Sequence, residues 1–288
     1  MTTRRAVTRR AVLGGALLAL AGGCARQRAT TSGGEVVAYG PHPDQVAEPT
    51  LPARTPLGVV VLVHGGYWRA GHHRTELGAA SRDLVTAGWA TWNLDYRGTT
   101  AGVPGWPTTF ADVAAAADRL VDVAAARGLR LDRTAVVGHS AGGALALWLA
   151  ARHRLPRGAV GAAPRLRPTA AASLAGVTLL EAGFRRARLG GSAIPDLLGG
   201  TPDQVPGRYA VADPGALLPV GVPLLVTHGT ADPVLPVWLA TEYAAAARAA
   251  GDRVRLVVQP GTDHGDVVVP GHPAWRAVRD WLDTEAAG

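Results

Sequence analysis

Ala135-Val136-Val137-Gly138-His139-Ser140-Ala141-Gly142-Gly143 is the stretch that decides the fold of this chain. Its first three residues read as a short buried strand, and an Ala- and Leu-rich segment of helical length begins at Ala141. Between them, Gly138 to Gly142 match the pattern G-x-S-x-G. A sharp strand-turn-helix connection strains the backbone at the serine and needs small neighbours, which the glycines supply. This context favours a nucleophilic Ser140 over an ordinary helix-capping serine.

Short apolar runs alternate with Ala-rich segments on both sides of this stretch, as in parallel strands joined by crossover helices. We predict one α/β domain over residues 35–288, with a mostly parallel central sheet and helices on both faces. The predicted strands are 57–63, 90–94, 135–138, 169–174, 223–227 and 254–258. The predicted helices are 75–87, 112–126, 141–152, 237–250 and 273–283. In the second of these helices Asp112, Asp118 and Arg119 are expected on the polar side.

Residues 178–219 are rich in Gly, Arg and Pro and show no clear period. An inserted cap over the carboxyl edge of the sheet has this composition, and so does a plain surface excursion. We expect a small cap insertion here.

A serine hydroxyl needs a base within hydrogen-bond reach and an acid that orients the base. Asp232 lies just beyond a predicted strand, and His264 lies in the loop after the last one, so the chain order is Ser, Asp, His. We predict a catalytic triad of Ser140, Asp232 and His264. Asp263 and Asp266 are alternatives to Asp232, but each lies too close to His264 in sequence to reach behind its ring. Of the other histidines, His72, His73, His139 and His153 are less suitably placed, and His228 is expected to be structural.

Hydrolysis of a carbonyl also needs N–H donors for the oxyanion, on the loop after the strand beside the nucleophile's strand. His64-Gly65-Gly66-Tyr67-Trp68 has this position, and its glycines let the backbone approach a substrate closely. We predict that the N–H groups of Gly66 and Ala141, with that of Tyr67 as a further donor, form the oxyanion hole. A glycine turn with Trp68 as core filler is the alternative for the pentapeptide alone.

These residues resemble the α/β-hydrolase superfamily over nearly the whole chain after the leader. Within it, the pair H-G-G-Y-W and G-H-S-A-G-G is similar to the esterase branch that includes arylformamidases (kynurenine formamidases) and hormone-sensitive-lipase-like esterases. The resemblance implies the oxyanion role of Gly66 and the triad roles of Ser140, Asp232 and His264. Tyr67 stands where hormone-sensitive-lipase-like enzymes carry a further Gly, which favours the formamidase and feruloyl or acetyl esterase side.

The predicted reaction is acyl transfer from a small-molecule ester, with a formamide as the alternative substrate, through an acyl-enzyme. It needs no metal and no organic cofactor. Aromatic side chains are the candidates for the acyl or alcohol pocket, although core packing is the more common role of each. These candidates are Tyr67, Trp68, Tyr96 and Trp106.

Composition excludes several other classes of protein. The chain has 288 residues, of which 48% are hydrophobic and 18% charged, and this is too apolar for a disordered protein. The formal net charge is +7, and it falls to +3 without the N-terminal segment of residues 1–24, which contributes Arg4, Arg5, Arg9 and Arg10. A nucleic-acid partner therefore has little electrostatic support. Cys24 is the only cysteine, which excludes an intramolecular disulfide and a Cys-based zinc cluster.

The first 24 residues resemble an export signal. Thr8-Arg9-Arg10-Ala11-Val12-Leu13 is similar to a twin-arginine signal, and the apolar stretch after it is too short to span a bilayer. Leu20-Ala21-Gly22-Gly23-Cys24 resembles a bacterial lipobox, so we expect lipidation of Cys24 and a flexible tether over residues 25–34. Cleavage at Ala19-Leu20-Ala21 would instead release a secreted protein. Either way, we expect an exported protein, and a lipid anchor on Cys24 would be its only link to the membrane.

Two other functions compete with an esterase. A lipase or serine peptidase would use the same triad, but the Arg-rich stretch 184–188 suits an apolar lid poorly, and the chain is short for an added recognition domain. A lipid-tethered binding protein on a hydrolase scaffold would be expected to lack triad residues. The sequence leaves the acyl group, the alcohol and the oligomeric state open.

Overall fold

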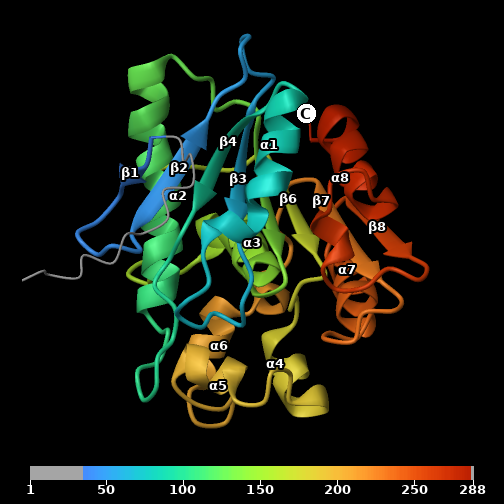
Figure 1. Cartoon of the computed structure of the whole chain (residues 1–288). Coiled ribbons are helices and arrows are strands. Elements are labelled where there is room, and N and C mark those ends of the chain that lie inside the picture. The colour runs from blue at the N-terminus through green and yellow to red at the C-terminus, as the bar shows by residue number, and fades with distance from the viewer. Residues whose placement is uncertain (1–34, 287–288) are drawn as a thin grey trace, which may run out of the picture. The chain divides into compact units, whose positions relative to one another are not determined.

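Eight strands form one mixed sheet in the order β1-β2-β4-β3-β5-β6-β7-β8 in the computed structural model, which describes residues 35–286 (Figure 1). Pairing is antiparallel for β1 with β2 and for β2 with β4, and parallel throughout the rest. The strands are β1 Val37–Ala38, β2 Val46–Thr50, β3 Val59–Val63, β4 Ala90–Leu94, β5 Thr134–His139, β6 Ala170–Leu174, β7 Leu224–Gly229 and β8 Val254–Gln259. The expected export signal, the tether and Cys24 lie outside the described residues.

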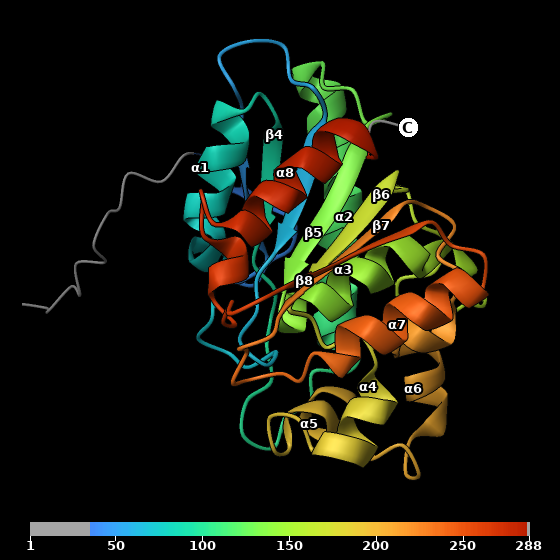
Figure 2. The same cartoon turned by 90° about the vertical axis from the view of Figure 1, so that its right-hand side faces the viewer.

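Helices cover both faces of the sheet, as the sequence predicts. One face packs against α2 (Thr108–Arg127), α3 (Ala141–Ala151) and α7 (Trp238–Ala249), and the other against α1 (Gly78–Thr86) and α8 (Pro273–Thr284). Figure 2 shows α1 and α8 on one side of the sheet and α3 and α7 on the other. Short helical turns η1 (Arg74–Leu77), η2 (Arg152–Arg154) and η5 (Asp266–Val268) lie in the connections. This arrangement is an α/β-hydrolase fold.

The central strands are buried on both faces because their side chains are apolar throughout. All five residues of β3, Val59 to Val63, are buried, and they pair in parallel with β4 and β5. Val63 pairs with Gly138, so β3 and β5 finish at the same level. The loop after β3 and the turn after β5 therefore meet at the carboxyl edge of the sheet, where open α/β sheets bind their ligands.

The sequence prediction missed the two antiparallel edge strands. β2 contains Glu48 and Pro49, and only every second residue of it is buried, so it lacks the apolar run that marks the central strands.

The prediction was also wrong about Asp112. Helix α2 begins at Thr108, four residues before the predicted start. Asp112 is buried rather than on the polar side, because Arg97 and Gln45 donate hydrogen bonds to its carboxylate.

A cap insertion joins β6 to β7, within the stretch where the sequence predicts one. It consists of α4 (Leu180–Ala182), the π-helical turn η3 (Gly183–Ala187), α5 (Ala193–Leu198), α6 (Pro206–Ala212) and η4 (Pro214–Leu217). Figure 1 shows α4, α5 and α6 gathered at one end of the sheet. Backbone N–H groups of Gly105 and Trp106 donate to the carbonyl oxygens of Asp196 and Leu197 at 3.1 and 2.6 Å, which joins the cap to the loop after β4.

None of the helices within residues 35–286 combines the length and the apolar character that crossing a membrane requires.

Candidate active site

Ser140 occupies a strained turn between β5 and α3. Its φ of 55° and ψ of −121° are unusual for a residue with a side chain, and its N–H is held by the Leu174 carbonyl at 2.9 Å. The helix that follows packs tightly against the end of β3: a β carbon on Gly142 would lie 2.1 Å from the Val63 carbonyl oxygen. Only glycine fits there, so the G-x-S-x-G spacing is a packing requirement of this turn.

His264 lies within hydrogen-bond distance of both Ser140 and Asp232, although the three residues are far apart in the sequence. The Ser140 Oγ is 2.9 Å from the His264 Nε2, and the His264 Nδ1 is 2.8 Å from the Asp232 Oδ2. Asp232 follows β7, and His264 lies in the loop between β8 and η5. The side chain of His264 is 16% exposed, whereas Ser140 is 4% exposed, so the imidazole reaches solvent above a nearly buried hydroxyl.

Asp232 is an ionised, well-anchored acid. Its Oδ1 accepts hydrogen bonds from the N–H groups of Val234 and Leu235 at 2.8 and 2.9 Å, and its Oδ2 faces both His264 and His228. Burial opposes ionisation of this carboxyl, but the hydrogen bonds from the two imidazoles and the two backbone N–H groups outweigh burial and hold its pKa well below the usual range.

The alternative acids near His264 bond within their own loop. The Oδ1 of Asp263 accepts from the N–H groups of Gly265 and Asp266, and the Oδ2 of Asp266 accepts from the N–H of Asp263. Neither carboxylate makes a hydrogen bond to the His264 ring among those of the described residues.

His139 contacts both the backbone and the ring of His264. Its Nε2 is 2.9 Å from the His264 carbonyl oxygen, and the two rings lie 4.8 Å apart. Because a carbonyl oxygen only accepts, the Nε2 of His139 carries the proton. Burial, together with the neighbouring His264 ring, lowers the pKa of His139 to about 4. His139 therefore stays neutral and holds the loop that carries His264, a role the sequence prediction did not give it.

The loop after β3, which the sequence proposes as the source of oxyanion donors, lies against Ser140. A β carbon on Gly65 would come within 3.0 Å of the Ser140 Cβ, and Gly66 has a φ of 95° that glycine adopts without strain. Within residues 35–286, the N–H groups of Gly66 and Tyr67 donate to no protein acceptor, and that of Ala141 lies in the unpaired first turn of α3. Three N–H donors are thus free beside the Ser140 turn.

Trp68 and Tyr96 belong to the support of this loop rather than to a substrate pocket. Trp68 is 1% exposed and donates from its Nε1 to the Ala141 carbonyl at 3.0 Å. Tyr96 is 3% exposed, donates from its hydroxyl to the His64 carbonyl at 3.0 Å, and stacks on the His64 ring at 4.3 Å. Their expected place in the pocket is corrected by this burial, because their polar atoms are already paired inside the protein.

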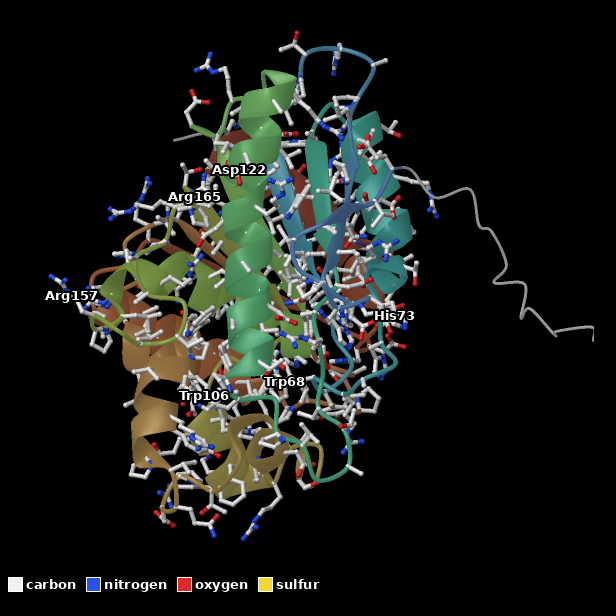
Figure 3. The ribbon with its side chains drawn as sticks, turned by 90° about the vertical axis from the view of Figure 1, so that its left-hand side faces the viewer. Trp68, His73, Trp106, Asp122, Arg157 and Arg165 are labelled. Carbon is white, nitrogen blue, oxygen red and sulfur yellow. The ribbon has the colours of Figure 1, made fainter. Side chains whose placement is uncertain are left out.

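Tyr67 and Trp106, unlike Trp68 and Tyr96, keep part of their surface exposed. Tyr67 is half-buried, and its ring packs beneath Gly190 of the cap, where a β carbon would lie 2.6 Å from it. Burial, together with the charge of Asp232, raises the pKa of the Tyr67 hydroxyl. Trp106 is half-buried, with its ring 5.2 Å from that of Phe110. Figure 3 shows Trp68 and Trp106 near the N-terminal end of α2, beside the cap.

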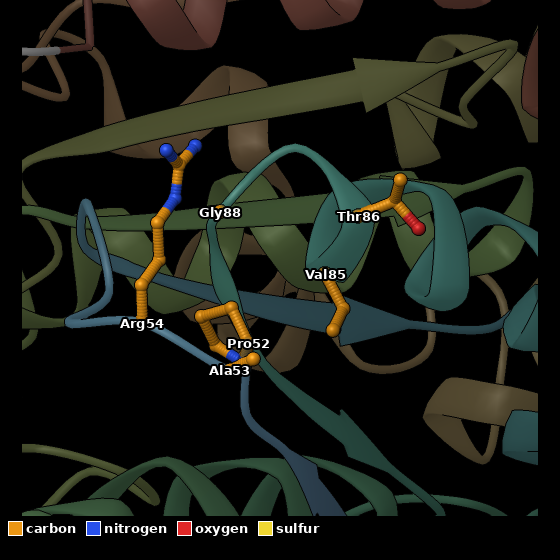
Figure 4. A pocket seen from close by; sticks show the side chains of 6 residues that line it. All are labelled: Pro52, Ala53, Arg54, Val85, Thr86 and Gly88. Atoms are coloured by element: carbon orange, nitrogen blue, oxygen red, sulfur yellow. The ribbon is translucent and has the colours of Figure 1, made fainter.

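A separate hollow lies at the opposite edge of the sheet. Its volume is about 410 Å³, and it is lined by Pro52, Ala53, Arg54, Val85, Thr86 and Gly88, which precede β3 and β4 (Figure 4). It contains no nucleophile, general base or candidate oxyanion donor. Within residues 35–286, no group of three or more His, Cys, Asp or Glu side chains is arranged to hold a metal ion.

Three solved structures with a similar fold are esterases, although their sequences differ greatly from this one. A truncated carbohydrate esterase from gut microbiota superposes with a TM-score of 0.74 at 17% identity, covering 88% of this chain and 95% of its own. Esterase B from Lactobacillus rhamnosis superposes with a TM-score of 0.74 at 20% identity, covering 88% of this chain and 84% of its own. A propionate-bound thermophilic esterase from Thermogutta terrifontis superposes with a TM-score of 0.70 at 23% identity, covering 87% of this chain and 92% of its own.

No curated protein matches the sequence significantly. The model of one protein family, BD-FAE, matches residues 48–246, a range that includes the oxyanion loop, Ser140 and Asp232 and ends before His264. Because this match covers well over half of the chain, the protein belongs to the BD-FAE family.

Proposed function

We propose that the protein is a serine hydrolase that cleaves small carboxylic esters through Ser140, His264 and Asp232. The observation that carries this proposal is the continuous hydrogen-bonded path from the Ser140 hydroxyl through the His264 ring to the Asp232 carboxylate. The free N–H groups beside Ser140 supply the second requirement of acyl transfer, a site for the negative oxygen of the tetrahedral intermediate.

The reaction proceeds in two half-reactions. The Ser140 Oγ attacks the ester carbonyl and passes its proton to the His264 Nε2, while Asp232 stabilises the resulting imidazolium through Nδ1–H. The N–H groups of Gly66, Tyr67 and Ala141 bind the oxyanion. The C–O bond to the alcohol then breaks as His264 returns the proton to the leaving oxygen. Water, deprotonated by His264, then attacks the acyl-enzyme and forms a second tetrahedral intermediate. Breakdown of this intermediate breaks the bond to the Ser140 Oγ, which takes the proton back from His264, and the carboxylic acid is released.

The similar structures support an ester rather than a formamide as the substrate. All three are described as esterases, one as a carbohydrate esterase and another with propionate bound. The burial of Ser140 and the packing of Tyr67 against the cap favour a short acyl group, because a long chain would have to displace Gly190. We therefore infer short-chain esters, with polar alcohols such as sugars as the first candidates.

We also propose that the protein is exported and anchored by a lipid on Cys24. The support lies in the sequence alone, in the twin-arginine pattern and the lipobox-like run before the only cysteine. The mass of the mature N-terminus tests the proposal: an acylated Cys24 agrees with it, and an unmodified chain beginning at Gly22 contradicts it.

Hydrolysis of p-nitrophenyl esters tests the proposed activity. The protein should hydrolyse the acetate and butyrate faster than the octanoate, and Ser140→Ala should lower kcat by more than about 10³-fold. Ser192→Ala is the matched control, because Ser192 is an exposed cap residue whose hydroxyl donates to Asp196. A fluorophosphonate should label Ser140 and no other serine. Equal turnover by Ser140→Ala would exclude the proposed nucleophile.

A further inference from the structure

His228 is a fully buried histidine that the proposed mechanism does not use. It lies in β7, four residues before Asp232, and is 0% exposed. Its Nε2 is 2.9 Å from the Leu235 carbonyl oxygen and 3.2 Å from the Asp232 Oδ2. From the sequence we expect only a structural role for His228, because nothing in the local pattern shows that this ring and His264 lie beside one carboxylate oxygen.

The protonation of His228 follows from its partners. A carbonyl oxygen only accepts hydrogen bonds, so the Nε2 carries the proton and donates to Leu235, while the Asp232 Oδ2 lies 3.2 Å from the same nitrogen. The Nδ1 of the ring has no partner within residues 35–286. The His228 Nε2–H therefore lies beside the carboxylate oxygen of Asp232 that also faces His264.

The two oxygens of Asp232 have different partners. The Oδ1 is fixed by the N–H groups of Val234 and Leu235, which hold the orientation of the carboxylate. The Oδ2 receives His264 at 2.8 Å and His228 at 3.2 Å. His228 therefore competes with His264 for the negative charge of the same oxygen, while the backbone N–H groups keep the carboxylate in place without it.

Resting on the function proposed above, we infer that His228 is a positioning residue that limits how strongly Asp232 stabilises the protonated form of His264. The N–H of His228 draws part of the charge of the Oδ2 towards itself. Without this donor, more of that charge faces the His264 Nδ1–H, and the imidazolium becomes more stable. Because the base acts only when neutral, a more stable imidazolium moves the acid limb of the kcat/KM profile to higher pH.

Other titratable groups near the triad act from greater distance or on other atoms. His139 bonds the His264 carbonyl rather than its ring, and Tyr67 faces Asp232 from the oxyanion loop. Asp263 and Asp266 bond within the loop that carries His264. Among the described residues, His228 is the side chain that shares the Asp232 Oδ2 with the base.

Two substitutions separate this role from simple core packing. His228→Met removes the donor and keeps a side chain of similar volume, whereas His228→Gln keeps an N–H near the position of Nε2. With the full-length protein and p-nitrophenyl acetate, we expect the acid limb of kcat/KM in His228→Met to move upward by about 0.5 to 1 pH unit. In His228→Gln it should coincide with the wild-type limb. Thermal unfolding and fluorophosphonate labelling of Ser140 verify that each variant is folded.

A superimposable acid limb in a folded His228→Met, a shift to lower pH, or equal shifts in both variants would overturn the inference. If His228→Met does not fold, nuclear magnetic resonance of the wild-type protein with ¹⁵N-labelled histidine decides. The chemical shift of the His228 Nε2 proton should change when His264 becomes protonated, because both rings face one carboxylate oxygen. A chemical shift that does not change would contradict the proposed role of His228. Failure of the proposed function can be distinguished from failure of this inference. If the proposed function is wrong, Ser140→Ala remains active, whereas failure of the His228 inference leaves Ser140→Ala inactive.

Discussion

The indole Nε1 of Trp68 donates a hydrogen bond of 3.0 Å to the carbonyl oxygen of Ala141, the residue after the nucleophile. This bond joins the loop after β3 to the first turn of α3, so the two sets of candidate oxyanion donors are fixed relative to each other. Both Tyr67 and Trp68 have positive φ, at 52° and 57°, and this tertiary bond helps to hold that strained backbone.

Trp68→Phe should therefore lower kcat by about tenfold with little change in KM, because the loop loses its link to α3 while substrate contacts remain. Steady-state kinetics with p-nitrophenyl acetate measure both constants. Trp89→Phe is the control, because it also removes the hydrogen bond of a buried indole, here to Asp283, but lies before β4 and should leave kcat within about twofold. A kcat for Trp68→Phe equal to wild type would mean that the loop holds its shape unaided.

Asp232→Asn should lower kcat by about 10³- to 10⁴-fold, because an amide N–H facing His264 favours the wrong tautomer of the base. Asp266→Asn should stay within about threefold of wild type, since the Asp266 carboxylate accepts from the Asp263 N–H and lies 3.9 Å from His272 rather than bonding the His264 ring. The pair distinguishes the two acids that the sequence left as alternatives. Comparable losses in both variants would contradict the assignment of Asp232.

The protein should lose stability as the pH falls from 6.5 towards 4. The pKa of His139 is lowered from 6.5 to about 4, so in this window the unfolded chain binds a proton that the folded protein does not. The free energy of unfolding therefore decreases with falling pH. Asp232, whose folded pKa is also lowered, keeps its stabilising contribution throughout the window above its ordinary pKa.

His139→Gln should weaken this acid sensitivity, because glutamine does not titrate and can still donate to the His264 carbonyl. Part of the loss of stability at low pH should remain in the variant, since burial also lowers the pKa of His64. Thermal unfolding at pH 7 and pH 5 tests the prediction. An identical decrease in Tm for wild type and variant would show that His139 does not contribute.

Gly142→Ala should destabilise the protein by about 2 to 4 kcal/mol, because its β carbon would lie 2.1 Å from the Val63 carbonyl oxygen. Gly207→Ala is the matched control: it lies in α6 with no atom within 4 Å of a β carbon, and alanine favours a helix. Urea unfolding of both variants measures the difference. Similar stabilities for the two would mean that the turn can relax around an added methyl group.

Asp118→Ala should cost about 3 to 5 kcal/mol, because it leaves Arg152 as a buried charge without its partner. Arg152 is 2% exposed, and its guanidinium bonds both carboxylate oxygens of Asp118 at 3.1 and 2.8 Å. Asp132→Ala removes one partner of an exposed ion pair with Arg130 and should leave Tm unchanged. The Tm values of the two variants, measured side by side, test whether burial decides the cost.

The elements that depend on local pattern could be predicted from the amino-acid sequence. The apolar run of β3, the glycines around Ser140 and the Ala-rich helices each carry a periodicity or a steric requirement that neighbouring residues impose. They were enough to predict the mostly parallel sheet, the turn at Ser140 and the order Ser, Asp, His along the chain. The edge strand β2 was missed because Pro49 and half-buried side chains give no such pattern.

Contacts between side chains that are distant in sequence could not be predicted and are seen only in the folded protein. That Trp68 bonds Ala141, that His139 holds the His264 carbonyl and that His228 reaches the Asp232 Oδ2 all depend on contacts between strands and loops far apart in sequence. The same burial moved Trp68 and Tyr96 from the expected pocket into the support of the oxyanion loop. Local sequence fixes the conformation of each turn, whereas the hydrogen-bond partner of a buried polar atom is fixed by whatever the packed sheet brings next to it.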